Sequence, residues 1–143
     1  MSNSISDIEN SKCLLIFGYN CADSHPIVAR RIVKAQEKGA KVIVCDPRVI
    51  ESARTADLYL PLKNGSNMAL VNAFANVLIN EGLYDKDYVS KYSEGFEEYK
   101  AGVAKYTPEY TAEITGLSPE LVRDAIRMYA AAPTATILWG MGV

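Results

Sequence analysis

The sequence predicts an α/β fold, a three-layer sandwich with a mainly parallel sheet and extra helices in its second half. Short apolar runs at residues 14–17 and 41–45 end in small or polar residues, as buried parallel strands do. Between them, apolar residues recur at helical spacing over 27–35. A strand, a helix and a second strand in this order form a right-handed crossover unit, so the two strands should pair in parallel.

The remaining elements of the first half follow from local signals. Ser24 is the expected N-cap of the first helix, with Pro26 tolerated in its first turn. Gly39 should end that helix. Residues 50–56 fit a short helix, and 57–62 fit a third strand whose proline indicates a sheet edge or a strand end.

The second half is mainly helical. A turn at 63–67 precedes a helix over 68–79, which is apolar around much of its circumference and should pack on several sides. Ser66 or Asn67 is the expected cap. The later expected elements are helical segments at 85–93 and 95–106, helices starting near 107 and 118, and a β-prone run at 134–139 that leads into a glycine loop.

Length and composition indicate one domain spanning residues 1–143, with 49% hydrophobic residues to form its core. The chain has 15 Lys and Arg against 17 Asp and Glu, which is too even to indicate a nucleic-acid partner or an acidic membrane. No apolar run approaches the roughly 18 residues that a membrane span needs. The polar first residues lack the pattern of a signal peptide, so a cytoplasmic location is expected.

Cysteine and histidine give no sign of a catalytic or metal site. Cys13, Cys21 and Cys45 contain no C-x-x-C pair. Cys13 and Cys45 should be buried in strands, whereas Cys21 falls in the first loop and could be exposed. His25 is the one histidine, and triads and metal clusters need several such groups. We therefore assign no catalytic and no metal-binding residue.

Polar residues follow the first strand where ligands bind in open α/β sheets. Asn20, Asp23 and Ser24 precede a helix, whose free N–H groups and dipole favour a phosphate. Asp23 could equally cap backbone donors. The loop has one glycine, Gly18, instead of the three of G-x-G-x-x-G, so a Rossmann-like dinucleotide-binding variant is expected rather than an ordinary NAD site.

Two further strand ends could complete this site. Asp46 stands where nucleotide-binding folds place an acidic residue for ribose hydroxyls, and Arg48 could stack on a base or bind phosphate. The alternative is a strand-terminating turn with a solvated ion pair. Gly65 and Asn67 repeat the arrangement after the third strand, although alone they would be only a helix cap.

Six motifs occur in order along the chain: FGYN at 17–20, ADSHPIVA at 22–29, VCDPR at 44–48, LKNGSN at 62–67, EGFEEY at 94–99 and ILWGMGV at 137–143. Together they resemble the molybdopterin oxidoreductase family, and within it the α subunits of formate dehydrogenases. The resemblance covers nearly the whole chain. Members of this family are much longer, so it implies an excised internal segment of a catalytic subunit.

The resemblance implies a bis-molybdopterin guanine dinucleotide cofactor with molybdenum or tungsten, and a 4Fe-4S cluster outside this segment. The residues that it assigns to the cofactor are Asn20, Asp23 and Ser24 in the first loop, Cys45, Asp46 and Arg48 in the second, Gly65 and Asn67 in the third, and Gly140 and Met141 near the pterin. The domain would contact one arm of the cofactor.

The implied parent reaction is formate oxidation to carbon dioxide. The family's metal ligand and iron-sulfur segment are not in this sequence, so the isolated chain is expected to be inactive. The implied partners are the remaining domains of the catalytic subunit and an electron-transfer subunit or acceptor. The alternatives are a domain of a nitrate reductase or other molybdopterin oxidoreductase, or a stand-alone nucleotide-binding or interaction module with tyrosines on its partner surface.

Overall fold

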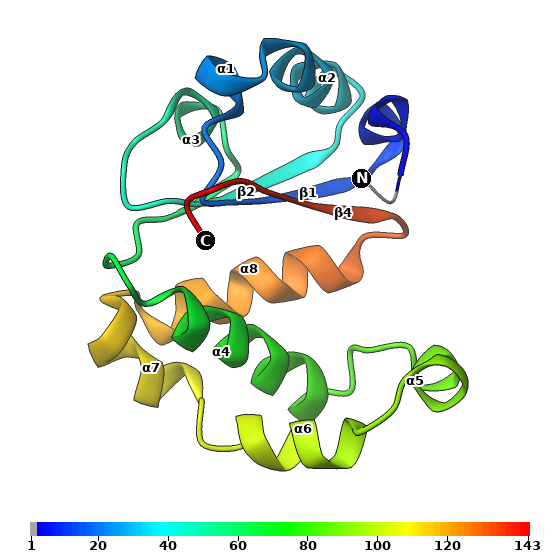
Figure 1. Cartoon of the computed structure of the whole chain (residues 1–143), viewed down its shortest axis with the longest axis vertical. Helices are drawn as coiled ribbons and strands as arrows, with labels where there is room; N and C mark the ends of the chain where they lie inside the picture. The colour runs from blue at the N-terminus through cyan, green and yellow to red at the C-terminus, as the bar shows by residue number, and fades with distance from the viewer. Residues whose placement is uncertain (1–2) are drawn as a thin grey trace. The chain divides into compact units, whose positions relative to one another are not determined.

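The computed structural model describes residues 3–143 and divides the chain into two compact units (Figure 1). The first unit contains the chain up to residue 62 together with residues 132–143. The second unit contains residues 63–131. None of the described helices is long and apolar enough to cross a membrane.

The first unit is built on a four-stranded, all-parallel sheet. Its strands are β1 (Cys13–Phe17), β2 (Lys41–Cys45), β3 (Leu58–Leu60) and β4 (Ala135–Trp139), in the order β3-β2-β1-β4. The expected α/β class and parallel sheet are therefore confirmed. β3 lies at an edge, as the proline after it predicted.

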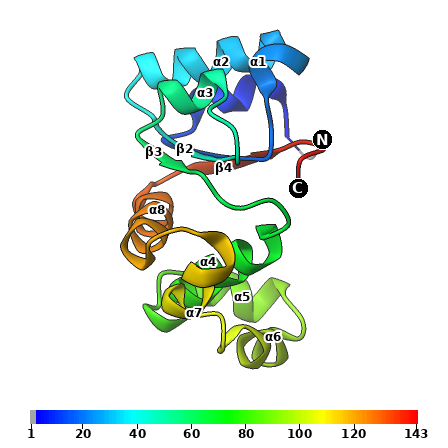
Figure 2. The same cartoon turned by 90° about the vertical axis from the view of Figure 1, so that its left-hand side faces the viewer.

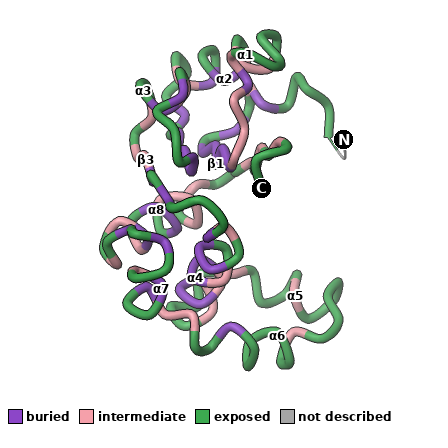
Figure 3. Tube along the Cα trace, turned by 60° about the vertical axis from the view of Figure 1, so that its left-hand side comes forward, coloured by how far each residue is buried: buried purple, intermediate pink, exposed green. Residues whose placement is uncertain are grey.

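Helices cover one face of this sheet (Figure 2). They are the 3-10 helix η1 (Ile5–Asn10), α1 (Cys21–Ser24), α2 (Pro26–Glu37) and α3 (Glu51–Arg54). Alternate strand residues, Leu14 and Ile16 of β1 and Val42 and Val44 of β2, form one core cluster with helix residues such as Ile32. The intervening strand residues are buried as well (Figure 3). Burial of all of β1 and of residues 42–45 of β2 explains why these two runs are apolar on both faces.

Helix η1 has no counterpart among the expected elements. Ser4 and Asp7 form a capping box at its start, in which the Ser4 N–H donates to Asp7 Oδ2 at 3.2 Å. Ile8 is its buried residue and belongs to the core cluster. The segment is short and contains a single buried apolar side chain, so it lacks the periodicity that identified the other helices.

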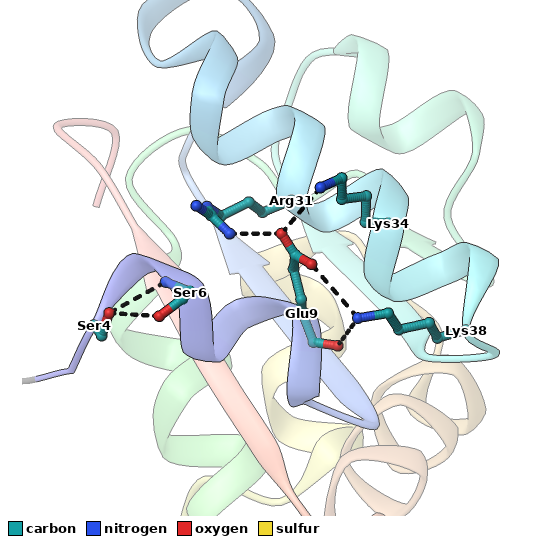
Figure 4. Close-up of polar contacts among 6 residues, drawn as sticks. All are labelled: Ser4, Ser6, Glu9, Arg31, Lys34 and Lys38. Carbon is teal, nitrogen blue, oxygen red and sulfur yellow. Dashed lines mark hydrogen bonds and ion pairs between the residues drawn. The ribbon is translucent and has the colours of Figure 1, made fainter.

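Glu9 ties η1 to α2 (Figure 4). Its carboxylate pairs with Arg31 at 2.5 Å and with Lys34 and Lys38 at 3.5 Å each. Burial disfavours the ionised form of Glu9, but the three cations outweigh it and hold the pKa of this carboxyl below its usual value. Helix η1 is thus fixed to the long helix α2 by charge as well as by Ile8.

Asp57 connects edge strand β3 to β2. Its Oδ1 accepts a hydrogen bond from Lys41 Nζ at 2.6 Å, and its Oδ2 accepts one from the Val42 N–H at 2.9 Å. Burial raises the pKa of Asp57, but these bonds and the Lys41 charge outweigh burial, so the pKa lies below its usual value. The ionised carboxylate therefore stabilises the fold above the unfolded-state pKa of about 3.9, and this contribution is lost as the pH falls through the lower folded-state pKa.

Replacing Asp57 with asparagine should lower the free energy of unfolding by about 1 kcal/mol near neutral pH. The difference from the wild-type protein should shrink as the pH falls below about 4. Urea denaturation at several pH values measures both effects. A difference that stays constant down to pH 2 would contradict the role assigned to the ionised carboxylate.

The second unit consists of five helices among its described residues. They are α4 (Asn67–Asn80), α5 (Lys86–Tyr92), α6 (Phe96–Val103), α7 (Pro108–Thr115) and α8 (Pro119–Ala131). The long apolar helix α4 packs against α6, α7 and α8, as its hydrophobic circumference predicted. Thr107 caps α7 by accepting the Tyr110 N–H, which confirms the expected cap-then-proline start.

One buried polar side chain joins two helices of this unit. Asn76 of α4 is 3% exposed. Its Nδ2 donates to the carbonyl oxygens of Val103 at 3.0 Å and Ala104 at 3.1 Å, at the end of α6. Its Oδ1 accepts a hydrogen bond from Asn80 at 3.0 Å. Asn76 therefore satisfies carbonyl groups that the end of α6 leaves without partners inside the helix.

Candidate functional site

A pocket of about 920 Å³ lies in the first unit, beyond the carboxyl ends of β1, β2 and β4. Its lining residues are 18–20, 23–25, 46–48 and 139–142, together with Ile5 and Val28. After β1 the chain adds β2 and β3 on one side of that strand, and it then returns to add β4 on the other side. Such a topological switch point is where open α/β sheets bind ligands.

Two glycines bring distant loops together at the pocket. The Gly142 N–H donates to the Gly18 carbonyl oxygen at 3.1 Å, and the Gly18 N–H donates to the Cys45 carbonyl oxygen at 2.9 Å. Gly18 has a φ of +55°, and a Cβ built on it would lie 2.6 Å from backbone atoms of Gly142. A Cβ on Gly142 would lie 2.7 Å from the Gly18 oxygen. Only glycine fits at either position without movement of the backbone.

The first loop is organised by hydrogen bonds among its own residues. Asn20 Nδ2 donates to Asp23 Oδ2 at 2.6 Å, and Ser24 Oγ donates to the Asn20 carbonyl oxygen at 2.8 Å. The expectation that Ser24 caps the long helix is wrong. His25 is the N-cap of α2, because the loop first forms the one-turn helix α1, and the Ser24 hydroxyl is turned back onto it. Asn20, Asp23 and Ser24 all line the pocket.

The second loop contributes a buried carboxylate. Asp46 is 6% exposed, lines the pocket and accepts the Arg48 N–H at Oδ1 over 2.8 Å. This bond forms the turn that the alternative interpretation expected. The ion pairs of the described residues do not include one between these two side chains. The exposed Arg48 lines the same pocket.

Three of the predicted residues do not line the pocket. Cys45 is fully buried, and burial followed by the Asp46 charge raises the pKa of its thiol above the usual range. Gly65 and Asn67 belong to the second unit. Ser66 is the N-cap of α4, but its hydroxyl donates to the Lys63 carbonyl oxygen instead of accepting a bond from the helix. The cofactor roles of Cys45, Gly65 and Asn67 stay predictions.

Cys21 also differs from expectation, because it is buried rather than exposed. It is 0% exposed, and its Sγ lies 3.4 Å from Ser52 Oγ of α3. The loop after β1 turns into α1, which points this side chain into the core cluster. Cys13 and Cys45 are buried, as expected.

The pocket also has aromatic side chains in its wall that were not predicted from the sequence. Tyr19 and His25 lie with ring centroids 5.5 Å apart, and Trp139 is 68% exposed. Trp139 directly precedes the glycine loop that contains Gly140 and Met141, both of which line the pocket. The position of Trp139 directly before a glycine at the end of a strand was the sequence signal that could have identified this residue.

The site combines the groups that a nucleotide needs. Exposed aromatic faces can stack on a base, a buried carboxylate can accept hydrogen bonds from ribose hydroxyls, and a guanidinium can bind phosphate. Trp139 supplies the aromatic face, Asp46 the carboxylate and Arg48 the guanidinium. No group of three or more His, Cys, Asp or Glu side chains within residues 3–143 is placed to hold a metal ion. The arrangement therefore favours binding of a nucleotide-like group.

Comparisons with known proteins agree on one family. The family model described as molybdopterin oxidoreductase matches residues 1–143. Formate dehydrogenase H of Escherichia coli (strain K12) is 57% identical over 143 residues, which are 100% of this chain and 20% of that protein. The F420-dependent formate dehydrogenase 1 subunit alpha of Methanococcus maripaludis is 47% identical over 100% of this chain and 21% of that subunit. The chain thus spans about a fifth of the length of these relatives.

The fold is found again in a solved structure. Acetylene hydratase from Pelobacter acetylenicus superposes with a TM-score of 0.85 and 35% sequence identity, covering 95% of this chain and 20% of that one. The parallel sheet and helices described above are therefore the architecture of a segment within a molybdopterin enzyme.

Proposed function

The chain belongs to the molybdopterin oxidoreductase family, and from this premise we propose that it is the cofactor-binding segment of a formate dehydrogenase catalytic subunit. Membership of the family implies a molybdopterin cofactor. The proposed parent reaction oxidises formate to carbon dioxide, releasing two electrons and a proton. The observation that carries the proposal is the pocket at the switch point of the sheet, in a chain 57% identical to formate dehydrogenase H along its whole length.

The residues present fit one arm of a bis-molybdopterin guanine dinucleotide. Gly18 and Gly142 both line the pocket, and their backbones approach so closely that neither position has room for a Cβ. Its volume of about 920 Å³ falls at the upper end of small-molecule and cofactor sites, which run from about 300 to 1,000 Å³. When bound, the cofactor supplies the redox chemistry at molybdenum or tungsten, and the protein supplies binding and orientation.

The residues of the proposed cofactor set then have defined tasks. Asp46 accepts hydrogen bonds from hydroxyl groups of the guanosine ribose, and Arg48 binds phosphate or stacks on the base. Asn20, held by Asp23, and Ser24 position the first loop against the dinucleotide. Gly140 and Met141 border the part of the pocket proposed for the pterin. Cys45, Gly65 and Asn67 complete our proposed cofactor set, and none of these residues is assigned to catalysis.

We further propose a cytoplasmic parent enzyme with a 4Fe-4S cluster in a different segment. Its partners would be the remaining domains of the catalytic subunit and an electron-transfer subunit or acceptor. The names of the F420-dependent relatives as alpha subunits support the idea of an assembly with other subunits.

Titration of this chain with guanosine diphosphate by calorimetry tests the pocket assignment. Asp46→Asn and Arg48→Ala should each weaken binding about tenfold or more, because a hydrogen bond to a charged group contributes about 1.5–3 kcal/mol. The matched controls are Asp124→Asn and Arg54→Ala, which change exposed side chains outside the pocket. Neither control should change the affinity.

Two results would contradict the proposal. One is a wild-type chain that does not bind guanosine diphosphate at millimolar concentration. The other is binding that is unchanged in both pocket variants. Adenosine diphosphate in the same titration shows whether the pocket distinguishes the base.

A further inference from the structure

Tyr59 of β3 lies on the same face of the sheet as Asp46. In the parallel ladder Tyr59 is paired with Val44, and it packs against the core cluster that contains Val44. Asp46 is two residues beyond Val44, and its N–H donates to the Leu60 carbonyl oxygen at 3.3 Å, so it directly continues the ladder. Side chains two residues apart on a strand share a face. Tyr59 and Asp46 are therefore diagonal neighbours, and Asp46 lines the pocket.

The hydroxyl group of Tyr59 is buried and makes no hydrogen bond with any residue in the described range 3–143. Leaving such a group without a partner is costly, and buried polar groups usually have one. Burial, followed by the charge of Asp46, raises the pKa of the phenol. The hydroxyl accordingly stays protonated at neutral pH and keeps a proton to donate.

Asp46 is suited to accept that hydrogen bond. Its Oδ1 accepts the Arg48 N–H, and the side chain is 6% exposed in the wall of the pocket. A carboxylate with two oxygens has several acceptor positions, so it can accept from a protein donor and from a ligand at the same time. A carboxylate that contacts a ligand gains from a second protein donor, because that donor fills a remaining acceptor position and holds the oxygens in one orientation.

We propose that Tyr59 is a positioning residue for Asp46: when a ribose occupies the pocket, the Tyr59 hydroxyl donates to the Asp46 carboxylate and holds it toward the ribose hydroxyl groups. This inference rests on the proposed function, because it assumes a nucleotide in the pocket. It assigns a ligand-binding role to an interior residue outside the pocket lining.

Titration of Tyr59→Phe with guanosine diphosphate tests the role. The variant should bind about fivefold more weakly than the wild type, the usual effect of losing one hydrogen bond. It should bind 2′,3′-dideoxyguanosine diphosphate with wild-type affinity, because that nucleotide has no ribose hydroxyl for Asp46 to contact. In an Asp46→Asn background, Tyr59→Phe should have no further effect. The matched control is Tyr88→Phe, which removes the hydroxyl of a 62% exposed tyrosine.

The outcomes separate this inference from the proposed function. If the wild type binds and Asp46→Asn weakens binding, but Tyr59→Phe does not, the role of Tyr59 is wrong and the pocket assignment stands. An equal loss for both nucleotides would show a merely structural role. If the wild type binds no nucleotide, the proposed function fails. The interaction between Tyr59 and Asp46 is then tested alone, by measuring the pKa of Tyr59 through NMR titration of labelled tyrosine. Asp46→Asn should then lower the pKa of Tyr59, and an unmoved pKa overturns the inference.

Discussion

Replacing Asn76 with aspartate is expected to lower the free energy of unfolding by about 3 kcal/mol at neutral pH. The substitution keeps the shape of the side chain but removes the two N–H donors that now reach Val103 and Ala104. The Ala104 oxygen would lose its partner, while the Val103 oxygen would keep its bond from the Tyr106 N–H. Both oxygens would face a buried carboxylate, and an unsatisfied buried group costs about 1–3 kcal/mol, more when it is charged. Urea denaturation followed by circular dichroism measures the loss.

Asn72 provides the matched control, because it lies on the same helix and is only half-buried. Asn72→Asp adds the same charge to α4 and should change stability by no more than about 0.5 kcal/mol. If the two variants lose equal stability, the added charge on the helix is responsible and the bond to the end of α6 is not. Acidification should partly restore Asn76→Asp, since the protonated acid regains one donor.

Elements with local signals were predictable from the sequence. Thr107 before Pro108 fixes the start of α7 through a hydrogen bond to the N–H three residues later. Apolar runs of four residues, 14–17 and 42–45, were sufficient to identify β1 and β2. Helix η1 was missed because its one buried residue gives no periodicity, although Ser4 and Asp7 carry a capping box. Ser24 was misassigned because a one-turn helix cannot be distinguished from a polar loop by pattern alone.

The pocket was predictable in outline because parallel strands bring their carboxyl ends to one edge of the sheet. That rule was sufficient to group Asn20, Asp46 and Met141, which all line it. It says nothing about a side chain buried within a strand, such as Tyr59, or about an aromatic residue at the end of β4, such as Trp139. Those positions depend on strand order and register, which pair β1 with a strand from the far end of the sequence.

Replacing Gly18 with alanine should separate the loops of the pocket and strongly weaken its binding of guanosine diphosphate. Two effects combine at this residue. A positive φ costs an alanine about 1–2 kcal/mol, and the new Cβ would lie 2.6 Å from backbone atoms of Gly142. The backbone must move to relieve that contact, and movement breaks the bond from Gly142 to the Gly18 oxygen. We expect at least a tenfold loss of affinity and about 3 kcal/mol less stability.

Gly39 separates the two effects, because it also has a positive φ, of +85°, but its added Cβ would have no atom within 4 Å. Gly39→Ala should therefore show only the backbone cost of about 1–2 kcal/mol and bind the nucleotide normally. Gly142→Ala should weaken binding as Gly18→Ala does, since its Cβ would lie 2.7 Å from the same oxygen. Normal affinity in both Gly18→Ala and Gly142→Ala would mean that the close approach of the two backbones is not needed for the site. Loss of affinity in both, with Gly39→Ala unaffected, would locate the requirement in that approach and not in the turn geometry of either loop.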